Sequence, residues 1–377
     1  MALVSHMKNH FIISLVAGVI LSVAALYFAF RNVPLYVLLN YLRSINYLWL
    51  FPAVLLVCVS FFIRAVRWRF ILASSHQIGI WQAFHPLMIG FMINCILPGR
   101  VGELARPIIL QKKQKIPFAT GIATVAAERI FDVAALIIFA VITFAVIEIN
   151  PQVEITFGDF HLNRSALEVL FNRIIIVGVL LIAAIIMVSI SRVRWRIHRV
   201  ILVIPALVFF ADESTKAKIN AKVCGPLIRF VDNIALGFTL IKHPKRIVIC
   251  GLYSLIVWMT AALSWYAFRL GCPGINLSYT QMYAVMVIIC LFIALPSVPG
   301  FWGLWEAGGV FAMSLFGISA NAAAGFTLAN HAVQVFPVII VGFVSAIITS
   351  VNIWQVSYER KSTENHKQVG KYFANMR

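Results

Sequence analysis

Two short stretches combine a helix-breaking Pro-Gly pair with a glutamate inside otherwise apolar parts of the chain. They are LPGRVGELARP at residues 97–107 and VPGFWGLWEAGG at residues 298–309. In each, a glycine lies three residues after the Pro-Gly pair, and a glutamate follows it. An ionised side chain at a bilayer centre costs roughly 2.5 to 3.5 kcal/mol on insertion scales, so charged groups at such depth indicate function. We therefore predict that the two stretches are functional counterparts.

The chemistry that these stretches favour is anion binding. A short helix that begins after Pro-Gly directs its free backbone N–H groups and the positive end of its dipole at the break. Gly99, Gly102, Gly300 and Gly303 would allow close approach of the backbone to a ligand. Arg100 adds a planar cation suited to phosphate or carboxylate. We predict a backbone anion site at the four glycines, which would bind one phosphate-bearing headgroup.

Further polar side chains lie on the helices that would follow the two breaks. Glu128 and His331 come thirty and thirty-two residues after the first and second Pro, respectively. Glu128 and Asp132 share a helix face, where two carboxylates repel unless a cation lies between them. Arg100 or Arg129 is the candidate cation. The predicted substrate-binding residues are Arg100, Glu103, Arg106, Glu128, Arg129, Asp132, Trp302, Trp305, Glu306, His331 and Gln334.

These residues also have a purely structural interpretation. The charged set could be a buried ion-pair network that only ties a hairpin to the next span. Trp302 and Trp305 could be packing or interfacial aromatics. His331 and Gln334, three residues apart on one helix face, could join helices by hydrogen bonds. The sequence leaves both interpretations open.

Composition assigns the chain to the membrane proteins. It has 377 residues, of which 62% are hydrophobic and 12% charged, and several apolar runs approach the length that spans hydrocarbon. The net charge of +18 comes from basic residues between apolar runs, as the positive-inside rule predicts, which argues against nucleic-acid binding. Lysines within 216–245 instead indicate contact with anionic inner-leaflet lipids. The six cysteines show no disulfide framework or metal spacing, and we expect no metal and no cofactor.

The apolar runs predict an all-α polytopic membrane protein with about six transmembrane helices and two re-entrant hairpins of half-helices. The predicted spans are 11–30, 47–63, 117–147, 173–191, 247–268 and 322–354, with an interfacial segment at 34–43. The hairpins are predicted at 82–110 and 280–317. Basic flanks place both ends of the first hairpin in the cytoplasm, whereas the second would enter from outside. Opposite entry is expected of an inverted-topology repeat.

The same charge pattern predicts the organisation of the chain. Both termini would be cytoplasmic, and the acidic loop that follows the third span would be external. We expect a vector remnant before Met7, a single membrane domain, and a basic cytoplasmic tail. The predicted boundaries are 1–6 for the remnant, 7–355 for the domain, 7–191 and 247–355 for its halves, 192–246 for a basic cytoplasmic connector, and 356–377 for the tail.

Three motifs together resemble the lysylphosphatidylglycerol synthase transmembrane-region family, also called flippase-like domain proteins. They are PGRVGELARP, AERIFD at 127–132, and VPGFWGLWEAG in the C-terminal half. The resemblance covers about residues 11–355 and implies a prokaryotic cytoplasmic (inner) membrane protein, whose best-studied relatives move aminoacylated phospholipid between leaflets. In those relatives a soluble aminoacyl-transferase domain follows additional spans. Because this chain stops at Arg377, we expect no synthase activity and leave the lipid open.

Two classes of function follow. The first is a flippase-like transporter that moves a phospholipid or polyprenyl-phosphate-type lipid with an anionic headgroup between leaflets through a midplane polar cavity. The alternative is an integral-membrane enzyme, with Glu128 or Asp132 as acid or base on a lipid-linked substrate, or an accessory subunit. The sequence contains no Ser/His/Asp set, metal cluster or P-loop that would support catalysis, so we expect no enzyme. A homo-oligomer is compatible with either class.

Overall fold

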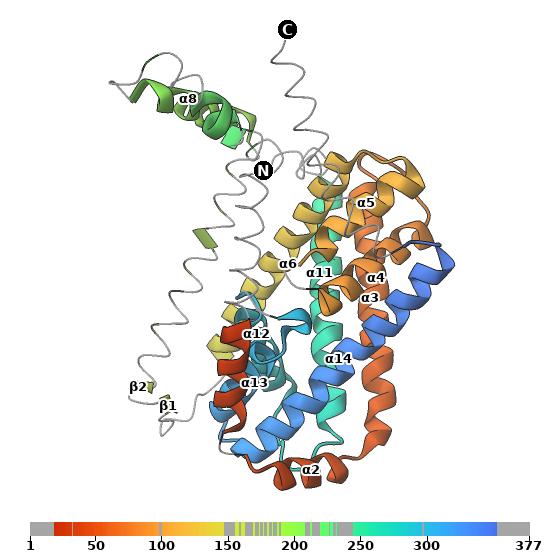
Figure 1. Ribbon diagram of the computed structural model, residues 1–377, viewed down its shortest axis with the longest axis vertical. Helices are drawn as coiled ribbons and strands as arrows, with labels where there is room; N and C mark the ends of the chain where they lie inside the picture. Colours follow the sequence, from red (N-terminus) through yellow and green to blue (C-terminus); the bar gives the residue numbers. More distant parts are fainter. Residues whose placement is uncertain are drawn as a thin grey trace, which may run out of the picture.

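The computed structural model describes most of the membrane-embedded part of the chain. The described residues are 19–31, 33–97, 100–146, 191–207, 244–295 and 298–352, together with short pieces between 155 and 231. The predicted vector remnant and the predicted basic tail lie outside the described residues. The fold is helical, as predicted, and Figure 1 shows its long helices running side by side.

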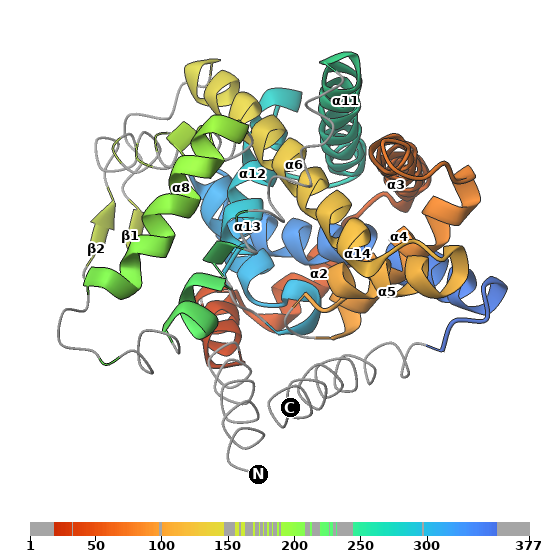
Figure 2. The same cartoon turned by 90° about the horizontal axis from the view of Figure 1, so that it is seen from above.

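Three of the described helices are long and apolar enough to cross a membrane. They lie at Tyr47–Leu72, Lys245–Arg269 and Ala320–Ile348, and a bent pair, Val19–Phe30 with Leu35–Ser44, would make a fourth span. The first three coincide with predicted spans. They contain helices α3 (Leu50–Leu72), α11 (Pro244–Arg269) and α14 (Ala320–Ile348), and the short turn η1 (Tyr47–Trp49) comes just before α3. Seen from above, α3 and α11 lie next to each other (Figure 2).

The remaining predicted spans are described in part. Helix α6 (Phe118–Val146) occupies the predicted span 117–147 and has 29 residues, which is about 43 Å of helix. Only the C-terminal half of the predicted span 11–30 is described, and most of 173–191 lies outside the described residues. Helix α2 (Leu35–Ser44) forms at the predicted interfacial segment and turns by 78° from the helix before it.

Two pairs of short helices form at the two Pro-Gly stretches. Helix α4 (Ile80–Ile96) packs against α5 (Gly102–Gln114), and α12 (Tyr279–Phe292) packs against α13 (Leu304–Ser314). Each of the four helices is shorter than the roughly 20 residues that cross hydrocarbon. The pair α4–α5 lies towards the upper end of Figure 1 and the pair α12–α13 towards the lower end.

The two pairs begin and break in similar ways. The side chain of Gln82 accepts a hydrogen bond from Gly79 N–H at the start of α4, and that of Gln281 accepts one from Ser278 N–H at the start of α12. A glutamine at this position is a helix-start signal. The first break holds Arg100 at a φ of 53°, and the second, which contains the short turn η5 (Pro299–Phe301), holds Gly303 at a φ of 89°. Left-handed backbone of this kind ends one helix before the next begins.

Close packing of α4 on α5 depends on two glycines. A Cβ added to Gly102 would lie 1.8 Å from the carbonyl oxygen of Gly90, so no side chain fits at either the start of α5 or its contact on α4. The larger core lies between the second pair and the long helices, where Phe268, Ile288 and Phe326 are buried. Both helix pairs are therefore fixed parts of the bundle.

The polar connectors add short elements. Strands β1 (Ile155–Phe157) and β2 (Phe160–Leu162) form an antiparallel hairpin in the predicted external loop. This hairpin was not predicted, although β-branched and aromatic residues around Gly158-Asp159 are typical of one. The basic connector contains α8 (Ser191–Val203), η2 (Ile204–Leu207) and the turn η3 (Asn220–Cys224), and the rest of it is described only in scattered residues.

Candidate functional site

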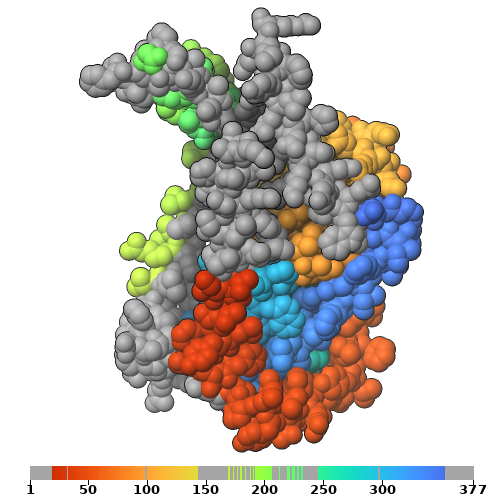
Figure 3. Space-filling view, viewed as in Figure 1, coloured from red at the N-terminus to blue at the C-terminus, as the bar shows by residue number. Residues whose placement is uncertain are grey.

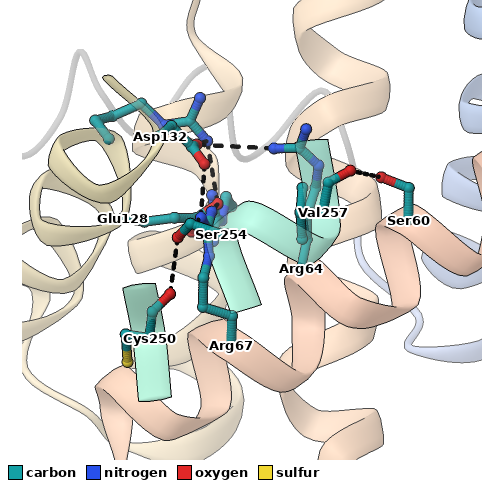
Figure 4. Close-up of polar contacts among 10 residues, drawn as sticks. Ser60, Arg64, Arg67, Glu128, Asp132, Cys250, Ser254 and Val257 are labelled. Carbon is teal, nitrogen blue, oxygen red and sulfur yellow. Dashed lines mark hydrogen bonds and ion pairs between the residues drawn. The ribbon is translucent and has the colours of Figure 1, made fainter. Parts of the chain in front are cut away.

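Three helices bring arginines and acidic residues together inside the bundle. Helix α6 packs against both α3 and α5 at this point, and Figure 4 shows how side chains from α3 and α6 converge. We call this group the arginine cluster. It consists of Arg64 and Arg67 of α3, Arg106 of α5, and Glu128, Arg129 and Asp132 of α6.

Each carboxylate of the arginine cluster contacts three arginines. Glu128 accepts a hydrogen bond of 2.5 Å from Arg106 and has oxygen-to-nitrogen distances of 3.1 Å to Arg129 and 3.3 Å to Arg67. Asp132 lies 2.6 Å from Arg67, 3.5 Å from Arg129 and 3.7 Å from Arg64. The spacing of four residues puts both carboxylates on one face of α6, where the arginines separate their charges.

The surroundings of the arginine cluster are buried and partly aromatic. The side chains of Arg67 and Glu128 are fully buried, and only that of Arg129, which is 34% exposed, reaches the surface. The guanidinium of Arg106 lies 4.0 Å above the ring of Trp68. Arg67 also donates to the hydroxyl of Ser254 on α11, which in turn donates to the carbonyl of Cys250 (Figure 4). Such a site is desolvated, so its charges interact strongly.

The positive charges of the cluster outnumber the negative ones. Four guanidinium groups share two carboxylates. Glu103 of α5 also interacts electrostatically with Arg106 and Arg129, and an excess of positive charge is still left. The Nε atoms of all four arginines are buried without a hydrogen-bond partner among the described residues. A buried charge excess with unsatisfied donors favours the binding of an anion.

The second glutamate lies in a separate polar group at the second break. Glu306 of α13 and His331 of α14 are both fully buried, and their Oε1 and Nδ1 atoms are 2.6 Å apart. Nε2 of His331 is 2.8 Å from the carbonyl oxygen of Gly300, which can only accept, so this nitrogen carries a proton. One further proton therefore lies between His331 and Glu306. The pair is neutral as a whole whichever of the two groups holds that proton.

Aromatic rings cover the imidazole of His331. The Trp305 ring is stacked on it at a centroid distance of 4.5 Å and an angle of 3°, and the Trp302 ring lies 4.3 Å away at 42°. Gln334, by contrast, donates to Ser264 of α11 at 3.1 Å, which is the helix-joining role that the sequence left open. Both tryptophans thus pack on the His331–Glu306 pair, whereas the side chain of Gln334 contacts α11 instead.

Helix N-termini at the two breaks are already occupied by side chains of the protein. Gly102 N–H donates to Oδ1 of Asn94 at 2.7 Å, and Gly303 N–H donates to Oε2 of Glu306 at 2.7 Å. A carboxylate at a helix N-terminus is stabilised by the helix dipole. Gly99 lies outside the described residues, and the backbone anion site stays a prediction.

The structure separates Arg100 from the other predicted site residues. Its guanidinium donates to the carbonyl of Ile293, just beyond α12, at 2.9 Å. Arg100 therefore connects the first break to the second helix pair, whereas Arg129 and Arg67 are the cations that contact both Glu128 and Asp132. Most of the predicted residues thus fall into two groups, with Arg100 and Gln334 outside both. The midplane polar cavity stays a prediction.

Sequence reasoning missed Arg64 and Arg67. The predicted span 47–63 ends before both arginines, but α3 continues to Leu72 and both side chains are buried. Ser254, the hydroxyl partner of Arg67, was missed as well. Their spacing of three residues could have indicated them, because it puts both arginines on one face of a helix.

These observations define a multi-pass helical membrane protein with a buried arginine cluster. The chain belongs to the family described as lysylphosphatidylglycerol synthase TM region, whose model matches residues 15–342. This confirms the resemblance inferred from the three motifs.

Three relatives that match large parts of the chain come from archaea. A UPF0104 membrane protein of Pyrococcus horikoshii is 25% identical over 263 residues, which cover 67% of this chain and 73% of that protein. A UPF0104 membrane protein of Methanothermobacter thermautotrophicus is 23% identical over 297 residues, which cover 78% of this chain and 83% of that protein. A protein named glycosyltransferase AglD, from Haloferax volcanii, is 24% identical over 93% of this chain, which spans 57% of its length. No solved structure matches the chain.

Proposed function

We propose that the protein moves a lipid with an anionic, phosphate-type headgroup between the leaflets of a prokaryotic cytoplasmic membrane. The observation that carries this proposal is the buried charge excess of the arginine cluster, because guanidinium groups with free donors favour phosphate. A phosphodiester would supply the missing negative charge and accept hydrogen bonds from the orphaned Nε atoms. The lipid chains would stay in the surrounding hydrocarbon.

The proposed topology has six spans and two re-entrant hairpins in an inverted repeat, with both termini in the cytoplasm. It is supported by the short helices of each pair, by their similar glutamine starts, and by their positions towards opposite ends of the bundle (Figure 1). Short broken helices at membrane depth are tolerated where protein covers them. Opposite entry would let one pair close while the other opens.

The second candidate function is an enzyme, or an accessory subunit, that acts on a lipid-linked substrate. The observation that favours it is the name glycosyltransferase of the Haloferax relative. Against it, the two carboxylates of α6 are each held by three arginines, which disfavours proton exchange with a substrate. Transport therefore remains the proposal that the geometry supports better.

A flux assay tests the proposed function. The purified protein, reconstituted into phosphatidylglycerol liposomes with a trace of headgroup-labelled phosphatidylglycerol, is expected to redistribute the label between leaflets without changing the lipid. Accessibility of the label to a membrane-impermeant quencher measures movement, and mass spectrometry measures conversion. Arg100→Gly, which suits the left-handed backbone there, is expected to slow redistribution, and Arg100→Lys to slow it less. Conversion of the lipid would support the enzyme, and an unchanged distribution for every phosphate lipid tested would refute transport.

The topology gives a separate prediction. In a variant with the native cysteines removed, a cysteine at Lys113, an exposed position in the last turn of α5, is expected to react only from the cytoplasmic side. A cysteine at Asn276, an exposed position before α12, is the matched control and is expected to react only from outside. Labelling with an impermeant maleimide on intact cells and on inverted vesicles measures both. Reaction of Lys113→Cys from outside would show that α4 crosses the membrane and would end the inverted-repeat proposal.

A further inference from the structure

An elongated apolar groove runs between two of the candidate spans. It has a volume of about 650 Å³, and its walls come mainly from α3 and α14, with the chain around α2 and η1 at one end. Fifteen residues line it, and nearly all are apolar, among them Leu50, Val54, Ala332 and Val333. A volume of this size is in the range of ligand sites, which are commonly 300–1,000 Å³. The groove is therefore large enough to be a binding site in its own right.

The open side of the groove faces the hydrocarbon of the bilayer. Phe336 and Ile340 line it and are 54% and 62% exposed, and both lie on α14, a candidate span. The space-filling view shows α14 (blue) at the surface of the molecule, above the orange-red residues of α2 (Figure 3). An apolar cavity does not retain water, and leaving it empty forfeits packing contacts in proportion to its volume. In a membrane, the available filler is a lipid chain.

The length of the groove matches one phospholipid chain. On α14 it extends from Leu328 to Val341, which is about 20 Å of helix. The hydrocarbon of one leaflet is about 15 Å thick, half of the roughly 30 Å core. The groove is therefore long enough for the whole chain of an ordinary phospholipid and much shorter than a polyprenyl chain of many repeats.

The groove touches the second polar group through one side chain. Trp302 lines the groove and also packs against the imidazole of His331, with ring centroids 4.3 Å apart. The indole thus lies between the apolar groove and the buried His331–Glu306 pair. Tryptophan is suited to such a boundary because its ring is amphipathic. A chain in the groove would bring its lipid to the second break.

We propose that the groove between α3 and α14 binds one acyl chain of a membrane phospholipid. This site is distinct from the arginine cluster and extends the proposed function, because it supplies a place for the chain of a lipid whose headgroup is bound elsewhere. Chain binding itself does not depend on transport.

Photolabelling tests the groove. The full-length protein is reconstituted in phosphatidylglycerol liposomes containing a trace of phosphatidylglycerol with a diazirine at the middle of one acyl chain, and the adducts are located by mass spectrometry. We expect at least fivefold more adduct on residues 328–341 than on residues 343–348, of which Phe343, Val344, Ile347 and Ile348 are also exposed on α14. Cys58, a free and exposed cysteine that lines the groove, is expected to carry adduct as well.

Matched variants distinguish the groove from the rest of the helix. Ala332→Trp fills the groove and is expected to lower labelling of residues 328–341 at least fivefold, whereas Ile347→Trp, at a position 75% exposed on the same helix, is expected to leave it unchanged. Ala329→Trp is the second groove-filling variant, and thermal unfolding confirms that each variant is folded. The wild-type labelling ratio needs no variant and tests the site by itself.

Three outcomes would overturn the proposal. The first is equal labelling of the groove and of residues 343–348. The second is groove labelling that persists in Ala332→Trp and Ala329→Trp although both variants are folded. The third is stronger groove labelling by a diazirine polyprenyl phosphate than by the phospholipid probe. Failure of the transport proposal has a different signature, because wild-type protein would then show groove adducts without any redistribution of lipid.

Discussion

Glu128→Gln is expected to destabilise the protein by about 3–5 kcal/mol, the range measured when one partner of a buried ion pair is removed. The reason is the charge excess of the arginine cluster, since Glu128 neutralises Arg67, Arg106 and Arg129 together. Arg106→Gln is expected to cost less, about 1.5–3 kcal/mol, the value of a hydrogen bond to a charged group. Removing a positive charge from a cluster with too many of them relieves repulsion, whereas removing a negative charge increases it.

Thermal unfolding in detergent measures this asymmetry. Glu103→Gln, at a half-buried position on the neighbouring helix, is the control and is expected to have a small effect. The double variant Glu128→Gln/Arg106→Gln is expected to recover part of the stability that Glu128→Gln loses, because the two groups are in direct contact. In the flux assay Arg106→Gln is expected to lower lipid movement at least tenfold despite its milder effect on stability. If both single variants are destabilised equally, and if flux falls only as much as the amount of folded protein does, the cluster is a purely structural ion network.

His331→Leu is expected to destabilise the protein by about 2–6 kcal/mol, because Oε1 of Glu306 and the carbonyl oxygen of Gly300 both lose their buried hydrogen bond to the imidazole, at about 1–3 kcal/mol each. Glu306→Gln should have almost no effect on stability. A glutamine can accept from Gly303 N–H and donate from its amide to Nδ1 of a neutral His331, while Nε2 still donates to Gly300. The substitution therefore keeps every hydrogen bond of the pair and removes only the proton that the two groups share.

This isosteric change allows a test of proton involvement. Lipid flux is measured against pH for Glu306→Gln, with Glu103→Gln as the counterpart at the first break and Gln334→Leu as a control on the same helix as His331. If both breaks act as gates, each glutamate substitution should alter flux or its pH profile, and Gln334→Leu should alter neither. Unchanged flux in Glu306→Gln together with lost flux in Glu103→Gln would leave only the first helix pair with a transport site.

The sequence by itself determined the features that depend on local composition. Apolar length and basic flanks predicted the helices that contain α3, α11 and α14, and the Pro-Gly pairs predicted where the short helices break. These signals are reliable because a helix that crosses hydrocarbon needs about 20 apolar residues, and a proline or a left-handed residue interrupts it wherever it occurs. The three motifs were also sufficient to identify the family.

The tertiary structure decided which polar groups meet. Of the two cations that the sequence proposed for Glu128 and Asp132, Arg129 contacts both carboxylates, whereas Arg100 donates to Ile293. The fully buried Arg67 of α3 also lies between them and was not predicted. The sequence put His331 and Gln334 on one helix face, and packing separates their partners, because His331 meets Glu306 and Gln334 donates to Ser264 of α11. Periodicity shows which face a residue occupies but not which helix covers that face. The ion-pair and hydrogen-bond partners that meet here are 25 to 65 residues apart in the sequence, so helix packing selects them. In a buried site, a charge must be paired with a group that this packing brings into contact with it.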